Sequence, residues 1–390
     1  MLISRPKGIP MIEPKIADLA LAHYPVTDNT TWSFIGMRAE DGVAGWGEAT
    51  WNRQPHSLDA PFETARLALR GQNRQRLDEL IASTPSSQAA AAVRSAPEQA
   101  SLDIRGKRAR RHAAFWQGTP VRHAIPLYAN INQGIRERTE QGFQHAARQA
   151  ELAGFDHIKI APFDGVGRDT AGTRQGRTLI DAGRRRVAAT RQALSQATEL
   201  YADCHWRFDA HIAVWVMEEL ASFGVTWFEC PLPETTDNFP SLKKLRSLAH
   251  RYNMRLAGLE ELTDAHAFEP WLQAGIYDVV MPDVKYAGGI SALLEIAGQA
   301  KKFGVTCSPH NPSGPVSHAA SLTACALAEN MARLEHQYNE TPLFWQWMSE
   351  DFPKPAGGAS LLPTQPGLGM HIPWPVANRL ADKQSLPSNR

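Results

Sequence analysis

Eight short runs of strand-forming residues recur between residues 125 and 337, and segments with the pattern of helices separate them. The runs follow one another at roughly 25 to 45 residues, which is the spacing of repeated strand–helix units. Strands and helices that alternate in this way pack as a parallel sheet, and eight such units close into a (β/α)8-type barrel, a modified TIM barrel. The predicted strands cover residues 125–131, 157–161, 199–204, 226–230, 254–259, 278–282, 304–308 and 333–337.

A doubly wound open sheet is the alternative arrangement of the same elements. The dinucleotide-binding form of that sheet carries a Gly-x-Gly-x-x-Gly turn after its first strand. The chain has no such turn after residues 125–131. The barrel is therefore the favoured α/β fold.

A different pattern precedes the barrel. Residues 15–40 alternate as strands do, Asp41-Gly42 marks a hairpin, and residues 60–117 have the periodicity of helices. The last residues are rich in proline and glycine, which indicates a wrapping segment rather than another domain. We therefore expect three regions: an α+β module over 1–122, the barrel over 123–344 and a C-terminal tail over 345–390.

The charge and the cysteines restrict the partners and the location. The chain has 41 lysines and arginines against 40 aspartates and glutamates, so its net charge of +1 offers no basic field to nucleic acid or to a membrane surface. No run reaches the roughly 18 apolar residues of a membrane span, and the N-terminal segment lacks the apolar core of a signal peptide. The four cysteines form no Cys-x-x-Cys pair, which favours reduced thiols and a cytoplasmic location.

Nearly every predicted barrel strand from the second onward ends at an ionisable residue, and the C-terminal strand ends are where such barrels perform chemistry. Three successive strands end at Asp203, Glu229, and either Glu260 or Glu261. Three converging carboxylates repel one another unless a cation lies between them, and oxygen ligands favour a hard divalent ion, above all Mg²⁺. The other ionisable residues at these ends are Lys159, His205, Asp283, His310, and Glu335 or His336.

The ordered motifs resemble those of the enolase superfamily, in its mandelate racemase/muconate lactonizing enzyme family and mandelate racemase subgroup. GWGEAT and EQASLDIRGK resemble the capping domain, which places that domain at residues 1–122 with the tail packed on it. YADCHWRF, WFECPLPE and RLAGLEELTD resemble the strand motifs that carry metal ligands. VVMPDVKYAGGI and VTCSPHNPSGPVSHAASL resemble the sixth and seventh strands, and PTQPGLGMHI resembles the C-terminal stretch. The resemblance implies one Mg²⁺, a small carboxylate substrate and a homo-oligomer.

The resemblance also implies roles for the strand-end residues. The metal ligands would be Asp203, Glu229 and Glu260, the last favoured over Glu261 by its register. His310 would abstract the proton α to the substrate carboxylate, and Asp283 would hold the other imidazole nitrogen. The metal would stabilise the resulting enediolate.

The carboxylate-binding side of the site would contain Lys159 and one residue of the eighth strand. Glu335 is favoured there, whereas a galactonate-dehydratase-like register would place His336, because alternation allows only one of them to face inward. The family usually has a second lysine, a base, two positions after the first. This chain has Ala161 at that position, so one face of the substrate lacks its usual base.

His205 follows Asp203 by two residues, as a catalytic acid does in galactonate and mannonate dehydratases of the family. One base and one acid eliminate water, so the favoured function is a Mg²⁺-dependent dehydratase of a sugar acid, an aldonate or aldarate, that yields a 2-keto-3-deoxy acid. The alternatives are a racemase, epimerase or cycloisomerase of a carboxylate, and a non-catalytic metal-stabilised binding protein. Asn130 and Asn132 are candidates to contact substrate hydroxyls, and residues 5–14 and 25–31 are candidates to cover the site.

Overall fold

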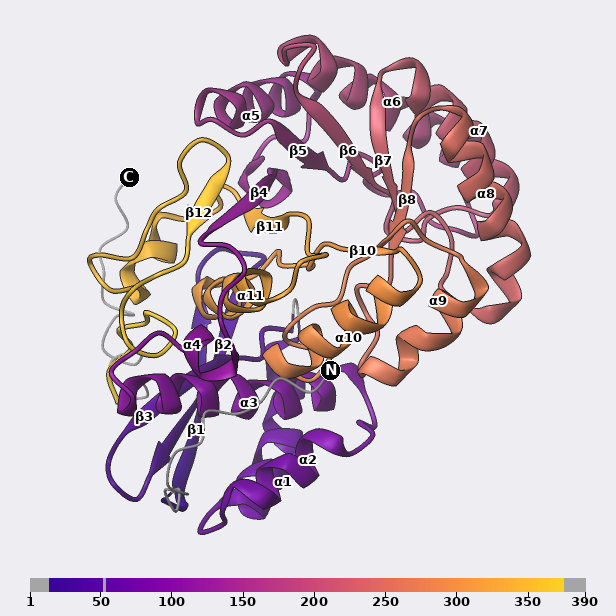
Figure 1. The fold of residues 1–390 in the computed structure, drawn as a ribbon. Helices are drawn as coiled ribbons and strands as arrows, with labels where there is room; N and C mark the ends of the chain where they lie inside the picture. The colour runs from indigo at the N-terminus through magenta and orange to yellow at the C-terminus, as the bar shows by residue number, and fades with distance from the viewer. Residues whose placement is uncertain (1–13, 52–53, 375–390) are drawn as a thin grey trace.

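The fold of the chain comes from a computed structural model, which describes residues 14–51 and 54–374. An antiparallel sheet with its own helices is built from the N-terminal residues, and a curled parallel sheet ringed by helices follows (Figure 1). The two parts are the predicted α+β module and the predicted barrel. Residues 5–13 of the first predicted covering loop, and residues 375–390 of the tail, lie outside the described residues.

The N-terminal sheet is the predicted meander, with the strand order β1-β2-β3 and antiparallel pairing throughout. Helix α3 lies directly against β3. A Cβ atom at Gly47 would lie only 2.7 Å from the Ala96 carbonyl carbon of α3, which is too close for two carbon atoms. Glycine at this position therefore lets the helix and the sheet pack at backbone distance. The elements are β1 (Ile16–Pro25), β2 (Thr31–Ala39), β3 (Ala44–Glu48), η1 (Pro55–Leu58), α1 (Asp59–Leu69), α2 (Arg74–Ala82), α3 (Gln88–Arg108) and α4 (Ala114–Gln117).

All eight predicted barrel strands are present, and they pair in parallel in the order β10-β9-β8-β7-β6-β5-β4-β11. A parallel bridge between Cys307 and Met331 joins β10 to the segment that leads into β11, so the curled sheet closes on itself. The strands are β4 (Ala124–Asn130), β5 (His157–Ile160), β6 (Glu199–Asp203), β7 (Val225–Glu229), β8 (Arg255–Gly258), β9 (Val279–Val280), β10 (Thr306–Cys307) and β11 (Leu334–Gln337).

Helices separate these strands in the chain and cover the sheet from outside (Figure 1). Thr139, Thr173 and Asp209 each begin one of them, since each side chain accepts a hydrogen bond from a backbone N–H of the first turn. The helices are α5 (Glu140–Leu152), α6 (Arg174–Ala193), α7 (Ala210–Ser222), α8 (Phe239–Arg251), α9 (Glu269–Ala274), α10 (Ile290–Lys302) and α11 (Pro315–Leu327). Short 3-10 turns are η2 (Asn132–Gly134), η3 (Thr236–Asn238), η4 (Ala265–Phe268) and η5 (Pro342–Trp347).

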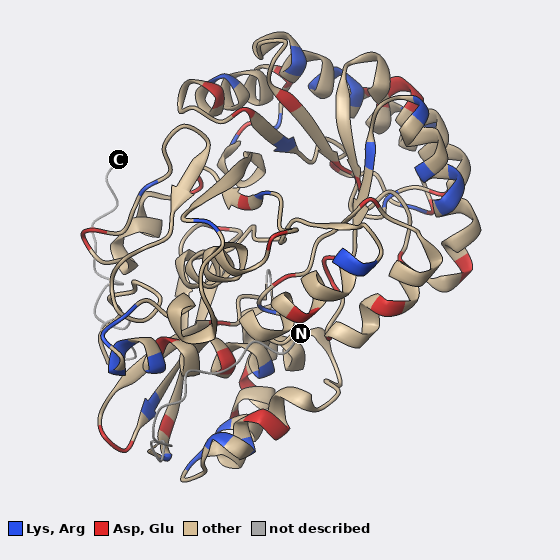
Figure 2. Cartoon of the chain, in the orientation of Figure 1, with Lys and Arg blue, Asp and Glu red and all other residues tan. Residues whose placement is uncertain are grey.

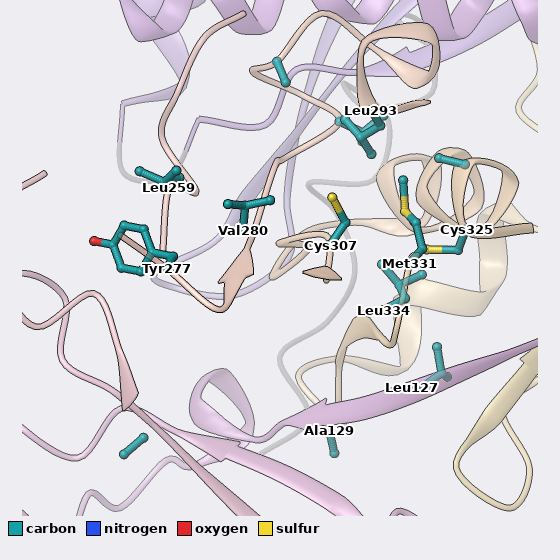
Figure 3. Packing of buried hydrophobic residues seen from close by; sticks show 14 of the residues in the cluster. Leu127, Ala129, Leu259, Tyr277, Val280, Leu293, Cys307, Cys325, Met331 and Leu334 are labelled. Atoms are coloured by element: carbon teal, nitrogen blue, oxygen red, sulfur yellow. The ribbon is translucent and has the colours of Figure 1, made fainter. Parts of the chain in front are cut away.

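Apolar side chains fill both sides of the barrel wall. Outside it, Val280 and Cys307 from neighbouring strands pack with Leu293 of α10 and Cys325 of α11 (Figure 3). Inside it, a separate cluster forms a floor below the strand ends, and the rings of Tyr201 and Trp227 stack there with centroids 4.6 Å apart. The floor cluster contains Tyr128, Tyr201, Trp227, Ala257, Val279 and Met281. The four cysteines are buried and unpaired.

The C-terminal segment returns to the N-terminal part. Strand β12 (Ala359–Leu361) pairs antiparallel with β4. Farther along, the Leu368 N–H donates to Asp103 of α3 at 2.9 Å, and the Trp46 indole of β3 donates to the Ile372 carbonyl oxygen at 3.0 Å. The described part of the tail therefore ties the barrel to the antiparallel sheet.

Charges are mixed over the surface. Lysine and arginine alternate with aspartate and glutamate along the outer helices, without a broad region of one sign in this view (Figure 2). In the described part of the chain, none of the helices combines the length and the apolar character that crossing a bilayer requires.

Candidate active site

Carboxylates from three neighbouring strands converge at the C-terminal mouth of the barrel. Asp203 and Glu229 are the last residues of β6 and β7 and are register partners, so their side chains point the same way. Glu260 follows β8 by two residues, after Leu259 with a φ of 75°. All three acids are buried, whereas Glu261 is exposed, so the structure turns Glu260 rather than Glu261 inward.

Each of these acids has a different cationic or imidazole partner. Asp203 Oδ2 lies 2.9 Å from His205 Nε2, and Glu229 Oε1 accepts a 2.6 Å bond from Lys159 Nζ. Glu260 Oε1 lies 3.5 Å from His310 Nε2. The carboxylate oxygens of the three acids do not all lie within 4.8 Å of one another. The carboxylates thus share one mouth without forming a closed ligand cage.

Two of the three acids, Glu229 and Glu260, would be stabilised in their ionised forms by a cation. Burial, together with the charges of Asp203 and Glu335, raises the pKa of Glu229 to about 7 despite the opposing Lys159 ammonium. Burial and the charges of Asp203 and Glu229 also raise the pKa of Glu260 well above its usual value. Added positive charge at this place would favour the ionised forms, and the donors are all oxygen, so the residues fit Mg²⁺.

Lys159 and Glu335 face each other across the barrel interior. Lys159 Nζ lies 2.8 Å from Glu335 Oε1, and both side chains are buried. The other oxygen of Glu335 accepts from the Asn311 N–H at 2.9 Å. His336 points to the helical side, where its ring stacks on Phe155 with centroids 5.8 Å apart. The alternation of β11 therefore turns Glu335, and not His336, toward the mouth.

Burial opposes the charge of Lys159, but Glu229 and Glu335 together raise its pKa well above its usual value. The side chain is thus a fixed ammonium. It is suited to binding a substrate carboxylate and not to accepting a proton.

The predicted His–Asp pair is assembled, and a lysine that the sequence reasoning missed completes it. Asp283 Oδ2 lies 2.8 Å from His310 Nδ1 and accepts a 2.5 Å bond from Lys285 Nζ. Burial raises the pKa of Asp283, but Lys285 and His310 outweigh it and hold that pKa below its usual value. The sequence contains a signal for this contact: Lys285 follows Asp283 by two residues, so the lysine side chain can reach back to the Asp283 carboxylate.

His205 lies just beyond β6 in a left-handed backbone conformation, with a φ of 46°. Its N–H donates to Asp203 Oδ1 at 2.9 Å, and its side chain is 42 % exposed. Burial lowers the pKa of His205, but the neighbouring Asp203 carboxylate outweighs this and raises it. The imidazole at the rim of the mouth therefore holds a proton more firmly than a free histidine does.

The two asparagines near the mouth are held by protein groups. Asn130 Nδ2 donates to Glu335 Oε1 at 2.6 Å, and Asn132 Oδ1 accepts from the Ala161 N–H at 2.6 Å. Asn130 and Asn132 also bond to each other at 2.7 Å. They therefore position the ends of β4, β5 and β11 around the mouth.

Comparison with known proteins identifies the family to which this chain belongs. A family model described as enolase C-terminal domain-like matches residues 142–376. A "putative dehydratase" from Zymomonas mobilis ZM4 has 22% sequence identity, a TM-score of 0.80, and coverage of 94% of this chain and 97% of that chain. A mandelate racemase/muconate lactonizing enzyme from Jannaschia sp. CCS1 has 22% identity, a TM-score of 0.81, and coverage of 96% and 99%. A member of the enolase superfamily from Salmonella Typhimurium has 19% identity, a TM-score of 0.81, and coverage of 95% and 98%.

Proposed function

Because the chain belongs to the enolase C-terminal domain-like family, we propose that it is a Mg²⁺-dependent dehydratase of a sugar acid, an aldonate or aldarate. The reaction would remove the proton α to the carboxylate and the hydroxyl on the β carbon, and would yield water and a 2-keto-3-deoxy acid. The similar protein from Zymomonas mobilis, whose description names a dehydratase, supports this choice among the reactions of the superfamily.

The observation that carries the proposal is the asymmetry of the mouth. His310 is held on one side by Asp283, and the position of the usual opposing base is Ala161, whose side chain has no ionisable group. The other imidazole at the mouth, His205, lies just beyond β6 and pairs with Asp203. One oriented base and one separate acid suit elimination better than inversion.

The charged side chains that face the barrel mouth would bind the substrate. Lys159 would bind the substrate carboxylate as an ammonium. Burial raises the pKa of Glu335, but Lys159 outweighs it and holds that pKa below its usual value in the free protein. Glu335 would bind the same carboxylate by donating a hydrogen bond after it takes up a proton on substrate binding. Asp203, Glu229 and Glu260 would hold the Mg²⁺. When bound, the ion supplies positive charge next to the substrate carboxylate, where negative charge accumulates as the α-proton leaves.

The proton transfers would use the two histidines. The unprotonated Nε2 of His310 would take the α-proton, and Asp283 would stabilise the imidazolium through the Nδ1–H. The electron pair of the broken carbon–hydrogen bond would form the carbon–carbon double bond as the β-hydroxyl leaves. His205 would protonate that hydroxyl so that it departs as water, and the enol product would become the 2-keto acid.

The first experiment is a screen of aldonic and aldaric acids with the Mg²⁺-loaded protein, in which we expect a 2-keto product from at least one acid. Proton–deuterium exchange with stereochemical inversion and no keto product would identify a racemase or epimerase instead. Tight binding of one acid without any turnover would identify a binding protein. We also expect a homo-oligomer, which sedimentation of the same preparation measures.

The different roles of His310 and His205 predict that their substitutions abolish different reactions. His310→Asn should abolish α-proton exchange in D₂O and dehydration together, because the described mouth offers no second base on that side. His205→Asn should retain exchange and lose dehydration by a factor of about 10² or more, the usual contribution of a general acid. Nuclear magnetic resonance of the substrate α position measures exchange, and a keto-acid assay measures dehydration. Loss of both reactions in His205→Asn would assign His205 to binding.

A further inference from the structure

A second group of metal-binding side chains lies outside the barrel. His23 belongs to β1, His56 to the 3-10 turn η1, and Asp59 is the first residue of α1. Among the residues that the structure describes, these three form the group of histidine, cysteine or acidic side chains whose donor atoms all lie within 4.8 Å of one another. The barrel-mouth acids do not meet that condition, so the two places differ in geometry as well as in position.

Each histidine has a donor nitrogen close to one oxygen of the Asp59 carboxylate. His23 Nε2 lies 2.9 Å from Asp59 Oδ1, and His56 Nδ1 lies 3.3 Å from Asp59 Oδ2. Ligands at the usual zinc distances, placed tetrahedrally, are roughly 3.3 to 3.6 Å apart. The three donor atoms lie within 4.8 Å of one another, so the side chains would have to close on an ion to form a coordination shell.

The protein orients these side chains before any ion is bound. His23 is the register partner of Ser33 on β2, and its Nδ1 lies 2.9 Å from the buried Ser33 hydroxyl, which turns Nε2 toward Asp59. Histidines that bind metals usually have such a partner on the other ring nitrogen. His56 and Asp59 are three residues apart across the start of α1 and share one face.

Charge and exposure favour a metal over a closed hydrogen-bonded group. Hydrogen bonds from His23 and His56 hold the pKa of Asp59 below its usual value, so the carboxylate is ionised near neutral pH. The His56 side chain is 83% exposed and that of Asp59 is 54% exposed, so an ion from solution can reach them. Two imidazoles and one carboxylate suit Zn²⁺, whereas the all-oxygen donors of the barrel mouth suit Mg²⁺.

We propose that His23, His56 and Asp59 bind a divalent ion of the zinc class, with water completing a tetrahedral shell. The ion joins the end of β1 to the start of α1. The segment just before η1 also contacts the barrel: the Tyr286 hydroxyl donates to the Thr50 carbonyl oxygen at 3.2 Å, and the Trp51 ring lies 5.7 Å from that of Tyr286. A bound ion would thus hold in place a segment near Thr50 and Trp51, which contacts Tyr286 in the loop that carries Asp283.

The test is a calorimetric titration of the untagged, Mg²⁺-saturated full chain with ZnCl₂. We expect one equivalent of Zn²⁺ in the wild type and at least about tenfold weaker binding in His56→Ala and in Asp59→Asn, because each removes a ligand. Ser33→Ala should weaken binding by about tenfold through the orientation of His23. His145→Ala, which removes an exposed histidine of α5, is the matched control and should bind as the wild type does.

Two further measurements keep the result independent of the barrel. Zn²⁺ should raise the melting temperature of the wild type and not that of Asp59→Asn, whose fold circular dichroism checks. Glu229→Gln should lose turnover and retain this Zn²⁺ equivalent. Equal Zn²⁺ binding by the wild type, His56→Ala and Asp59→Asn would place the ion elsewhere, and absence of binding at millimolar Zn²⁺ would leave a hydrogen-bonded group only. Either result overturns the proposal.

Discussion

At the scale of single residues, Asp283 depends on two neighbouring side chains, Lys285 and His310. Its carboxylate and the Lys285 ammonium are fully buried, and the Lys285 N–H also donates to Asp283 Oδ1 at 2.8 Å. The same carboxylate orients His310. A buried charge is tolerated when its partner remains and is costly when the partner is removed. Lys285 therefore stabilises the fold. It also holds in place the Asp283 carboxylate, which orients His310.

Lys285→Met should destabilise the protein by about 3 kcal/mol, because it leaves the Asp283 carboxylate with only the imidazole of His310. Urea unfolding of the single and double variants measures this. The double variant Asp283→Asn/Lys285→Met should lose less stability than the sum of the two single changes, because it removes both charges together. Strictly additive losses would show that the two side chains are not coupled.

At the scale of elements, the two parts of the molecule are joined at helix ends. Helices α10 and α11 follow Gly289 and Gly314, which have no side chain to cap them. Glu98 of α3 accepts from the Ile290 N–H at 2.8 Å and the Ser291 N–H at 3.1 Å. Glu48 of β3 does the same for α11, where it accepts from the Gly314 N–H at 2.8 Å. Two glutamates of the N-terminal part thus serve as caps for two barrel helices.

Glu98→Gln should cost about 1 to 2 kcal/mol of stability, because an amide NH₂ group replaces one of the two oxygens that accept from the first N–H groups of α10, while the shape is kept. Thermal and urea unfolding measure the loss. Glu79→Gln on the exposed face of α2 is the matched control, and we expect no measurable loss of stability there. Equal stabilities of the Glu98 and Glu79 variants would show that α10 does not need this cap.

At the scale of the whole molecule, buried histidines set the response to acid. Burial lowers the pKa of His112 and of His336 to about 4, and burial together with the nearby His336 lowers that of His318 well below its usual value. These imidazoles are neutral in the folded chain and become protonated in the unfolded chain below pH 6.5. The unfolded state then binds more protons, so stability falls as the pH decreases.

We therefore expect the free energy of unfolding to decline between pH 6.5 and pH 4, by up to about 3 kcal/mol for each fully buried imidazole. Urea unfolding at several pH values measures the slope. His336→Phe, which keeps a ring next to Phe155, should reduce it. The exposed-site control His145→Phe should leave the slope unchanged. A slope that is the same in all three proteins would assign the acid sensitivity to other groups.

The local pattern of the sequence was sufficient for the elements and for much of the mouth. Strand–helix spacing predicted the eight barrel strands, and all are present. The period of two residues along a strand places Asp203 and Glu229 at neighbouring strand ends. The strands depend on residues close together in the chain, so periodicity predicts them. Alternation along β11 requires only that one of Glu335 and His336 faces inward, and the resemblance to the mandelate racemase subgroup favoured Glu335.

Only the tertiary structure shows which distant segments contact one another. The capping of α10 by Glu98, the pairing of Glu229 with Lys159, and the meeting of His23 with His56 and Asp59 follow from how helices and sheets pack. No periodicity along the chain encodes them. Their geometry is set by side-chain volumes and charges on elements that become neighbours only when the chain has folded.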